Sequence, residues 1–317
     1  MYNPKTRKYL LVLLAIGWGI ILAYQLKKPQ KIYHDNRLLM GTFWEVVSSD
    51  KRAGGIVFSE ASRIEQLLSR YIESSEISRL NRLGRLKVSP DTFYIIKRSK
   101  EFWQLTNGAF DITVGPLVDL WGFKNQQYSL PTQGQVKSVL KLIGEDKIIL
   151  REKDSVVEFK VPGMQIDLGG IGKGYALDCA VSKLKENHIN SCLINAGGQV
   201  YALGNKSGRP WKIGIKKARG ANLSGSLEIK NQSLSTSGDY EQFFSKNGKR
   251  YSHIFDPKTG YPASSGIIAV TVVAPSGTDA DALSTSVFIL GKQGADELGK
   301  KFPEARFYIQ ENEAKKQ

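Results

Sequence analysis

The sequence predicts an α+β fold with largely antiparallel sheets and flanking helices, preceded by an N-terminal signal or membrane helix. The 317 residues, 41% hydrophobic and 24% charged, have the composition of a globular chain that forms one large domain or two interlocked ones. From Lys147 onward, short β-rich runs at hairpin spacing alternate with helices, which favours antiparallel pairing over a doubly wound parallel sheet. The third observation is an uncharged apolar segment near the amino end.

Residues 1–30 are expected to form a signal anchor with basic flanks. Residues 9–26 carry no charge and follow three basic residues, and a helix of that length reaches ~27 Å, close to the ~30 Å thickness of the hydrocarbon layer. Bulky Tyr24 follows Ala23 where a cleavage site needs small residues, so an uncleaved anchor is favoured over a cleaved signal peptide. We therefore expect the catalytic domain on the extracytoplasmic (periplasmic) side of the cytoplasmic membrane.

The domain is expected at 31–312, before a polar tail at 313–317, and its first half combines one strand with several helices. The β-rich run at 37–48 predicts the strand. Apolar residues then recur at helical spacing, while Ser75, Ser89 and Gly84 are typical start and stop signals. Helices are therefore expected at 53–70, 75–83, 89–105 and 132–143, with a compact turn and helix at 110–123.

The second half is predicted to be mainly strands with two helices. Alternating or short apolar runs bounded by Gly, Asn and Ser indicate strands. These are expected at 147–150, 155–159, 164–168, 192–195, 199–204, 211–215, 225–230, 233–236, 267–274 and 306–309. Longer stretches with helical periodicity predict helices at 172–187 and 279–290.

A glycine-rich stretch, IDLGGIGKGYALD at 166–178, joins a predicted strand to a predicted helix. Glycines there let the backbone approach a ligand, and amides at a helix N-terminus can bind an anion. The spacing matches neither a Walker loop nor the Rossmann fingerprint. A phosphate-binding turn and a merely tight turn both remain open.

The segment TDADALSTSVFILG at 278–291 places Asp281 and Thr285 four residues apart at a helix start. A carboxylate and a hydroxyl on one helix face supply the oxygen ligands that a hard cation such as Mg²⁺ prefers. The alternative is that Asp279 and Asp281 only stabilise the positive end of the helix dipole.

His253 lies in YSHIFDPKTGYP at 251–262, between a predicted strand and the turn signal Asp256-Pro257. An imidazole there can take a proton from a hydroxyl nucleophile, although a purely structural histidine is the alternative. The other two histidines, His34 and His188, stand in contexts that do not suit a zinc site. No Gly-x-Ser-x-Gly elbow supports a covalent hydrolase.

Together with LMGTFWEV (39–46), SRYIESSEISRLN (69–81) and GAFDITVGPLVDLWGF (108–123), these motifs resemble, in this order, the ApbE family of FAD:protein FMN transferases. The resemblance covers nearly all of the chain after the anchor. It implies a T-fold-related domain that cleaves FAD with Mg²⁺, attaches FMN through its phosphate to a threonine or serine hydroxyl of an acceptor flavoprotein, and releases AMP.

The resemblance also implies site residues by position. His253 would be the catalytic base, and the metal would be held by the Gly172 carbonyl with the side chains of Asp281 and Thr285. FAD would be bound by Met40, Tyr71, Ala109, Phe110, Asp111, Lys173 and Ile254. Gln199 departs from the family, in which acidic residues or Asn are commoner at that position.

The family resemblance points to acceptors such as subunits of membrane NADH:quinone reductase or RNF-type complexes. Two alternatives are an FAD pyrophosphatase that uses water in place of the hydroxyl and a non-catalytic extracytoplasmic FAD-binding protein. The formal net charge of +15 also suits nucleic acid. Because no motif for reading a nucleic-acid groove is present, nucleic-acid binding is not expected.

Overall fold

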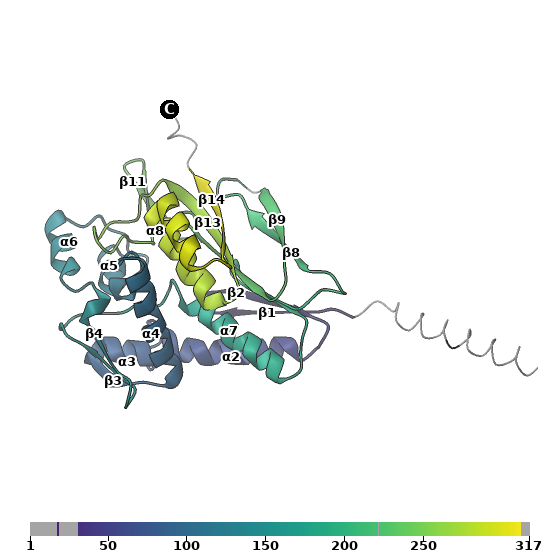
Figure 1. Cartoon of the computed structure of the whole chain (residues 1–317). Helices are drawn as coiled ribbons and strands as arrows, with labels where there is room; N and C mark the ends of the chain where they lie inside the picture. The colour runs from purple at the N-terminus through teal and green to yellow at the C-terminus, as the bar shows by residue number, and fades with distance from the viewer. Residues whose placement is uncertain (1–17, 19–30, 221, 312–317) are drawn as a thin grey trace, which may run out of the picture.

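The computed structural model describes Trp18, residues 31–220 and residues 222–311 (Figure 1). Apart from Trp18, the expected anchor at 1–30 and the expected tail at 313–317 lie outside the described residues. Within these described ranges, no helix combines the length and the apolar character needed to cross a membrane.

A seven-stranded sheet forms the centre of the molecule, and all of its neighbouring strands pair antiparallel. This arrangement confirms the predicted α+β class with a largely antiparallel sheet. The strand order is β1 (Tyr33–Leu39), β2 (Thr42–Ser48), β6 (Cys192–Ala196), β7 (Gln199–Leu203), β10 (Gln232–Gly238), β13 (Ile267–Ala274) and β14 (Arg306–Glu311).

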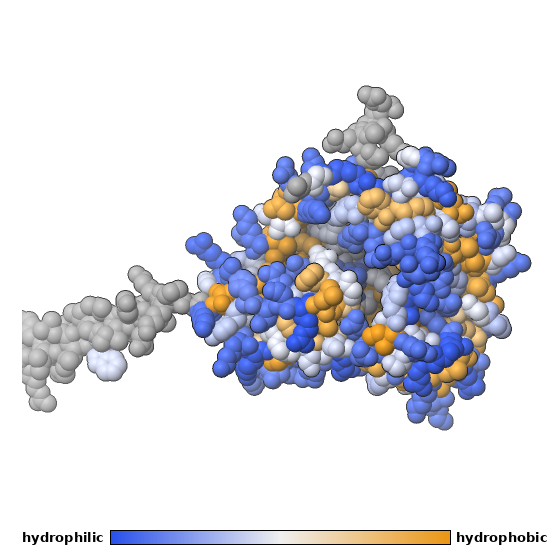
Figure 2. Space-filling model, turned by 180° about the vertical axis from the view of Figure 1, so that it is seen from behind, coloured by the Kyte–Doolittle hydropathy of each residue, from blue (hydrophilic) through white to orange (hydrophobic). Residues whose placement is uncertain are grey.

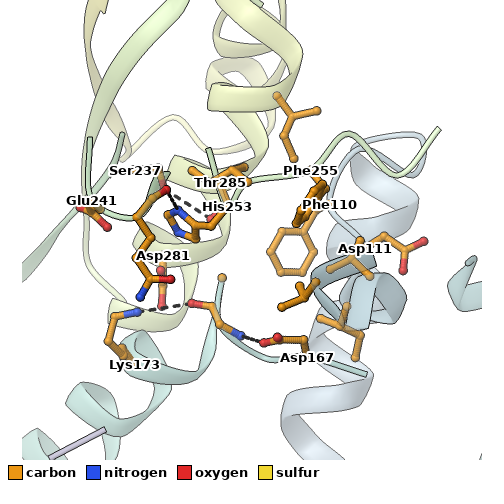
Figure 3. Close-up of a pocket in the computed structure, with 18 of the residues that line it drawn as sticks. Phe110, Asp111, Asp167, Lys173, Ser237, Glu241, His253, Phe255, Asp281 and Thr285 are labelled. Carbon is orange, nitrogen blue, oxygen red and sulfur yellow. Dashed lines mark hydrogen bonds between the residues drawn. The ribbon is translucent and has the colours of Figure 1, made fainter. Parts of the chain in front are cut away.

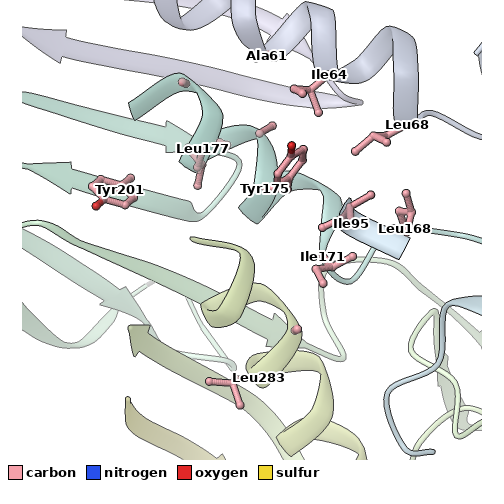
Figure 4. Close-up of a cluster of buried hydrophobic side chains, with 14 of the residues drawn as sticks. Ala61, Ile64, Leu68, Ile95, Leu168, Ile171, Tyr175, Leu177, Tyr201 and Leu283 are labelled. Carbon is pink, nitrogen blue, oxygen red and sulfur yellow. The ribbon is translucent and has the colours of Figure 1, made fainter. Parts of the chain in front are cut away.

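Three long helices cover one face of this sheet. Side chains alternate between the two faces of a strand, so Trp44 and Val46 of β2 join the core beneath the helices while Val47 joins the core on the other face. In this main core Ile64 and Leu283 are fully buried (Figure 4). The helices are α2 (Ala53–Leu68), α7 (Gly172–Glu186) and α8 (Gly277–Lys301).

A hairpin of β8 (Trp211–Lys216) and β9 (Leu223–Ile229) covers the opposite face. Its Trp211 and Ile213 pack on the sheet, and the Trp211 indole donates to the carbonyl of Leu203 at 3.2 Å. Along β8 the buried residues alternate with exposed ones, so one side of the strand faces the core and the other faces solvent. The surface seen in Figure 2 is mainly hydrophilic and is hollowed near its centre.

The remaining elements build a lobe at one end of the sheet (Figure 1). A third core surrounds Trp121, whose indole donates to the carbonyl of Gly260 at 3.0 Å. The elements are α3 (Glu76–Leu83), α4 (Pro90–Leu105), α5 (Gly115–Leu120), α6 (Gln133–Leu140), the short helices Ile112–Val114 and Glu145–Lys147, the sheet of β3 (Arg85–Lys87), β5 (Val156–Phe159) and β4 (Ile148–Arg151), and the hairpin of β11 (Phe243–Lys246) and β12 (Lys249–Ser252).

The carboxylate of Asp178 on α7 holds the start of α8. It accepts hydrogen bonds from the backbone N–H groups of Gly277 at 2.6 Å and Thr278 at 2.8 Å, and from the hydroxyls of Ser276 and Thr278. An acid at this position satisfies free N–H groups and favours the helix dipole. The two helices approach so closely that a Cβ on Gly174 would lie 2.1 Å from the Gly277 carbonyl oxygen, so only glycine fits there.

Two expected strands differ in the structure. The run at 37–48 is a hairpin, because Met40 (φ 50°) and Gly41 (φ 71°) turn the chain between β1 and β2. The run at 164–168 is not a strand. Its Ile166 N–H and C=O are instead bonded to the side-chain amide of Asn81 at 2.8 and 2.9 Å, so a side chain takes the role of a neighbouring strand.

Other elements were shorter or longer than expected. The strands β3 and β11, of three and four residues, are too short for a periodicity that the sequence could reveal, whereas β12 is the strand expected before His253. Helix α8 continues to Lys301 across a kink at Gly291 (φ 80°), beyond the expected end at residue 290. The glycine interrupts the helix without ending it.

Replacing Asp178 by Ala should lower the free energy of unfolding by ~2–4 kcal/mol, because it leaves several donors at the start of α8 without an acceptor. Chemical denaturation measures the change. The matched control is Asp296→Ala, which changes an exposed acid on α8 that is far from its start. Equal stability of the two variants would contradict the role given to Asp178.

Candidate active site

A cavity of about 270 Å³ opens between α8 and β10 on one side and the segment 109–118 on the other (Figure 3). Residues distant in the sequence meet in it. All residues expected at the site except Gly172 line this cavity: Met40, Tyr71, Ala109, Phe110, Asp111, Lys173, His253, Ile254, Asp281 and Thr285.

Asp281 is the most deeply buried acid of the cavity, with 2% of its surface exposed. One carboxylate oxygen accepts from the Gly174 N–H at 3.0 Å, and the other accepts from the side-chain amide of Gln199. Burial raises the pKa of Asp281, while the positive charge of Lys173 opposes the shift. Lys173 is the main cation that offsets the negative charge of this buried carboxylate. A further cation beside it would therefore be stabilised.

Other oxygen atoms surround this carboxylate. Thr285 lies one helical turn further along α8, and its hydroxyl is 3.4 Å from that of Ser237. The side-chain oxygen of Gln199 is buried and has no hydrogen-bond partner in the described part of the chain. These donors are of the type that Mg²⁺ prefers. Among the described residues, no group of three or more His, Cys, Asp or Glu side chains forms a cluster that could hold a metal.

Gly170, rather than Gly172, is the glycine that lies beside Thr285 in the cavity. A Cβ on Gly170 would lie 3.1 Å from the Thr285 hydroxyl, and Gly170 lines the cavity. Gly172 is the first residue of α7 and is buried away from the cavity. A carbonyl in the first turn of a helix points along the helix axis and accepts a bond within the helix, so the position of Gly170 suits a ligand better than that of Gly172.

His253 follows β12 and points into the cavity (Figure 3). Its Nδ1 lies 3.1 Å from the carbonyl oxygen of Gln242. Since a carbonyl only accepts, Nδ1 must carry the proton, which leaves the lone pair on Nε2 free. Desolvation by the surrounding protein lowers the pKa of His253 to about 4. The ring is therefore neutral at pH 7 and can act as a base.

The opposite wall is mainly apolar and carries one acid. Phe110 is buried and packs against Phe102, with 5.8 Å between ring centroids. The Met40 N–H donates to the side chain of Glu65 at 2.8 Å, which fixes the turn at the rim. Asp111 accepts from the Thr113 N–H at 2.7 Å, and burial raises the pKa of Asp111 to about 6. This wall suits a flat aromatic ligand with a polar edge.

A buried arginine positions the floor of the cavity. Arg70 forms ion pairs with Asp119 at 2.7 Å and with Asp167 at 3.0 Å, and its own side chain is only 2% exposed. Asp167 lines the cavity. Tyr71, which lines it as well, follows Arg70 directly in the sequence. The ion pairs therefore join the end of α2 to the strand-like segment that leads into the glycine turn.

The cavity also has lining residues that were not predicted as ligands, among them Asp167, Gly170, Gln199 and Glu241. Asp167 and Gly170 belong to the glycine-rich motif, so their position in it was an available signal. Gln199 was noted only as a departure from the family, and Glu241 lies in a stretch without a motif. The folded chain brings Gln199 to Asp281 and both residues into the cavity.

Fold and cavity together define an α+β enzyme domain in which a neutral histidine, a buried carboxylate and a half-buried hydroxyl face one ligand pocket. The chain belongs to the ApbE family, whose model matches residues 40–309.

Curated relatives and solved structures agree with this assignment. The FAD:protein FMN transferase of Klebsiella pneumoniae is 35% identical over 268 residues, covering 82% of this chain and 83% of the relative, and that of Haemophilus influenzae is 31% identical over 317 residues, covering 93% and 91%. The ApbE protein of Thermotoga maritima has a TM-score of 0.82 at 34% identity, covering 90% of this chain and 98% of that one. The flavin transferase ApbE of Vibrio cholerae has a TM-score of 0.80 at 27% identity, covering 89% and 94%.

The imidazole of His253 should titrate near pH 4 in the ligand-free protein, because the folded chain disfavours its charged form. The unfolded chain takes up this proton at higher pH, so the contribution of His253 to stability is lost as the pH falls from 6.5 to 4. Proton NMR of the ring signals measures the midpoint, with His253→Gln identifying the signal. A midpoint between 6 and 7 would show that the ring is solvated.

Proposed function

We propose that this chain is an FAD:protein FMN transferase, which moves FMN from FAD to a threonine or serine hydroxyl of an acceptor protein and releases AMP. The observation that carries the proposal is the meeting, in one cavity, of the free Nε2 of His253 with the buried carboxylate of Asp281 and the half-buried hydroxyl of Thr285. Phosphoryl transfer needs positioning, charge neutralisation and a base. His253 would supply the base, and Asp281 with Thr285 would hold a cation that positions and neutralises the pyrophosphate.

In the proposed reaction, the acceptor hydroxyl oxygen forms a bond to the phosphorus of the FMN half of FAD. The bond from that phosphorus to the bridging oxygen of the pyrophosphate breaks, and AMP leaves with this oxygen. The hydroxyl proton passes to Nε2 of His253, which is neutral at pH 7. The amine of Lys173, at the start of α7, faces the same cavity and favours the anionic pyrophosphate.

We propose that Mg²⁺ is held by the side chains of Asp281 and Thr285 and by the backbone carbonyl of Gly170, in place of that of Gly172. Gln199 contacts Asp281 through its amide nitrogen, and its buried side-chain oxygen has no partner among the described residues, so it can accept from a water of the bound ion. When bound, Mg²⁺ would neutralise pyrophosphate charge and polarise the phosphorus. Protein ligands are few, which fits an ion that completes its octahedron with water and phosphate oxygens.

The flavin is proposed to lie against the apolar wall of the cavity. Phe110 and Ile254 are buried there, while Tyr71 is 64% exposed at the rim and can pack on a flat ring. Met40, Ala109 and Asp111 line the same wall, where Asp111 offers a polar contact at its edge.

Incubation with FAD and Mg²⁺, with and without an acceptor, tests the proposed reaction. A transferase yields a flavinylated acceptor, a pyrophosphatase yields free FMN and AMP regardless of acceptor, and a simple FAD-binding protein leaves FAD intact. If His253 is the base, His253→Ala should bind FAD with nearly unchanged affinity and transfer FMN ~10²–10⁴-fold more slowly. Normal transfer by that variant would remove His253 from the mechanism.

We also propose that residues 1–30 anchor the enzyme at the outer face of the cytoplasmic membrane. Acceptors such as subunits of membrane NADH:quinone reductase or RNF-type complexes would then lie within reach. The formal net charge of +15 supports this location, since basic proteins are attracted to anionic lipid surfaces. Release from membranes by high salt alone would contradict an anchor, and a mature chain that begins after residue 26 would identify a cleaved signal.

Asp281→Asn should abolish the response to Mg²⁺ while keeping the fold, because the amide preserves the shape of the side chain but removes its charge. In the wild-type protein with inorganic pyrophosphate, Mg²⁺ at 100 times its Kd should add ~2.7 kcal/mol to the free energy of unfolding. Thermal melts with and without Mg²⁺ measure this effect. An equal Mg²⁺ shift in the variant would contradict the metal assignment.

A further inference from the structure

A second cavity adjoins the active site at the wall that holds His253. The two cavities share Met40, Lys173, Thr236, Glu241, Gln242 and His253. Asp281 and Thr285 line only the first cavity, whereas β8 lines only the second. The two spaces therefore meet at the proposed base, where Met40 and Lys173 of the proposed FAD site also lie. They differ elsewhere: the proposed metal ligands Asp281 and Thr285 line only the first space, and β8 lines only the second.

The second cavity is a groove with one open strand edge. All five residues from Lys212 to Lys216 of β8 line it, and no residue of β9 does. In the described part of the chain, β8 pairs with β9 alone, in a two-stranded sheet. The Lys216 carbonyl accepts from the side-chain amide of Gln310 at 3.0 Å. The other backbone groups of β8 that point away from β9 can pair with an added extended segment, as in β-strand addition.

The floor of the groove combines apolar residues of the central sheet, among them Leu193, Val200 and Leu234, with small and polar residues at or beside the β1–β2 and β6–β7 turns. Gly41, Gly197 and Gly198 line it, together with Thr42 and Asn195. No heavy atom lies within 4 Å of where a Cβ on Gly41 or Gly198 would stand. This space lets the backbone of a second chain approach the sheet closely.

The groove is positively charged along β8. Lys212 and Lys216 are exposed, and among the described residues neither lies within ion-pair distance of a carboxylate. Lys173 adds a third positive charge at the shared wall, against the carboxylates of Glu45 and Glu241 elsewhere in the lining. The β8 side of the groove therefore favours acidic side chains on its occupant.

We propose that this groove binds the acceptor protein. An extended acceptor segment adds to the free edge of β8 and places acidic side chains beside Lys212 and Lys216. It carries small residues next to its reactive hydroxyl, which enters the active site past His253. The inference rests on the proposed function, because it assigns the second substrate of the same reaction. It also explains how the hydroxyl reaches Nε2 without passing the space assigned to FAD.

Charge reversal on β8 tests the proposal. The double variant Lys212→Glu/Lys216→Glu changes only exposed side chains, and Lys230→Glu, exposed just after β9 and outside the groove, is the control. The acceptor source is a membrane preparation from the native host with this gene deleted, supplied with FAD and Mg²⁺. In-gel flavin fluorescence should show transfer slowed ~10-fold or more in the double variant and unchanged in the control.

The same variants separate this inference from the proposed function. FAD affinity, measured by fluorescence titration, should be unchanged in the double variant, because neither lysine lines the first cavity. If the wild-type chain flavinylates nothing, the proposed function fails. If the wild type and the double variant transfer at equal rates, the function stands and the groove is not the acceptor site.

Hydrogen exchange tests the mode of docking. With the acceptor purified from the fluorescent band, amide exchange along Lys212–Lys216 should slow, while that of β9 should not. Protection that rises with enzyme concentration in the absence of acceptor would show that a second copy of the chain occupies the groove, which would overturn the proposal. Unchanged exchange on β8 with saturating acceptor would also overturn it.

Discussion

The joint between α7 and α8 is the constraint on which the rest of the site depends. Asp178 bonds to the first N–H groups of α8, and the missing side chain of Gly174 lets the two backbones touch. Because α7 begins with the glycine turn and α8 carries Asp281, this one contact sets the distance between the glycine turn and the carboxylate proposed to bind the cation. Both helices also bury their apolar faces in the main core, so catalytic geometry and folding free energy share the same contacts.

Several polar groups of the site lack a full set of hydrogen-bond or charge partners in the protein. Asp281 is buried with one cationic neighbour, the oxygen of Gln199 is without a partner among the described residues, and His253 is desolvated. Such groups are unfavourable in an empty protein and favourable once a charged ligand arrives. The surrounding fold, with Arg70 fixed by two carboxylates, holds them in place against this unfavourable energy.

Local signals made much of the fold predictable. Ser75 and Gly84 bound α3 as their types suggest, since a cap acts within a few residues of itself. Hydrogen bonds between residues far apart in the sequence were not predictable. Asn81 bonds to Ile166 from 85 residues away and turns an apparent strand into a loop. For the same reason, motif residues such as His253 could be expected at the site, whereas Gln199 acquires its place at Asp281 only through the pairing of β7 within the sheet.

The free edge of β8 has a consequence for the protein in a crowded compartment. An unpaired strand is a template for self-association, and two such edges would combine into an intermolecular sheet. On β8 the solvent-facing positions are Lys212, Gly214 and Lys216. Antiparallel pairing of two copies would bring like charges together across the new interface, which opposes the pairing. Lysines at these positions therefore act as gatekeepers against aggregation.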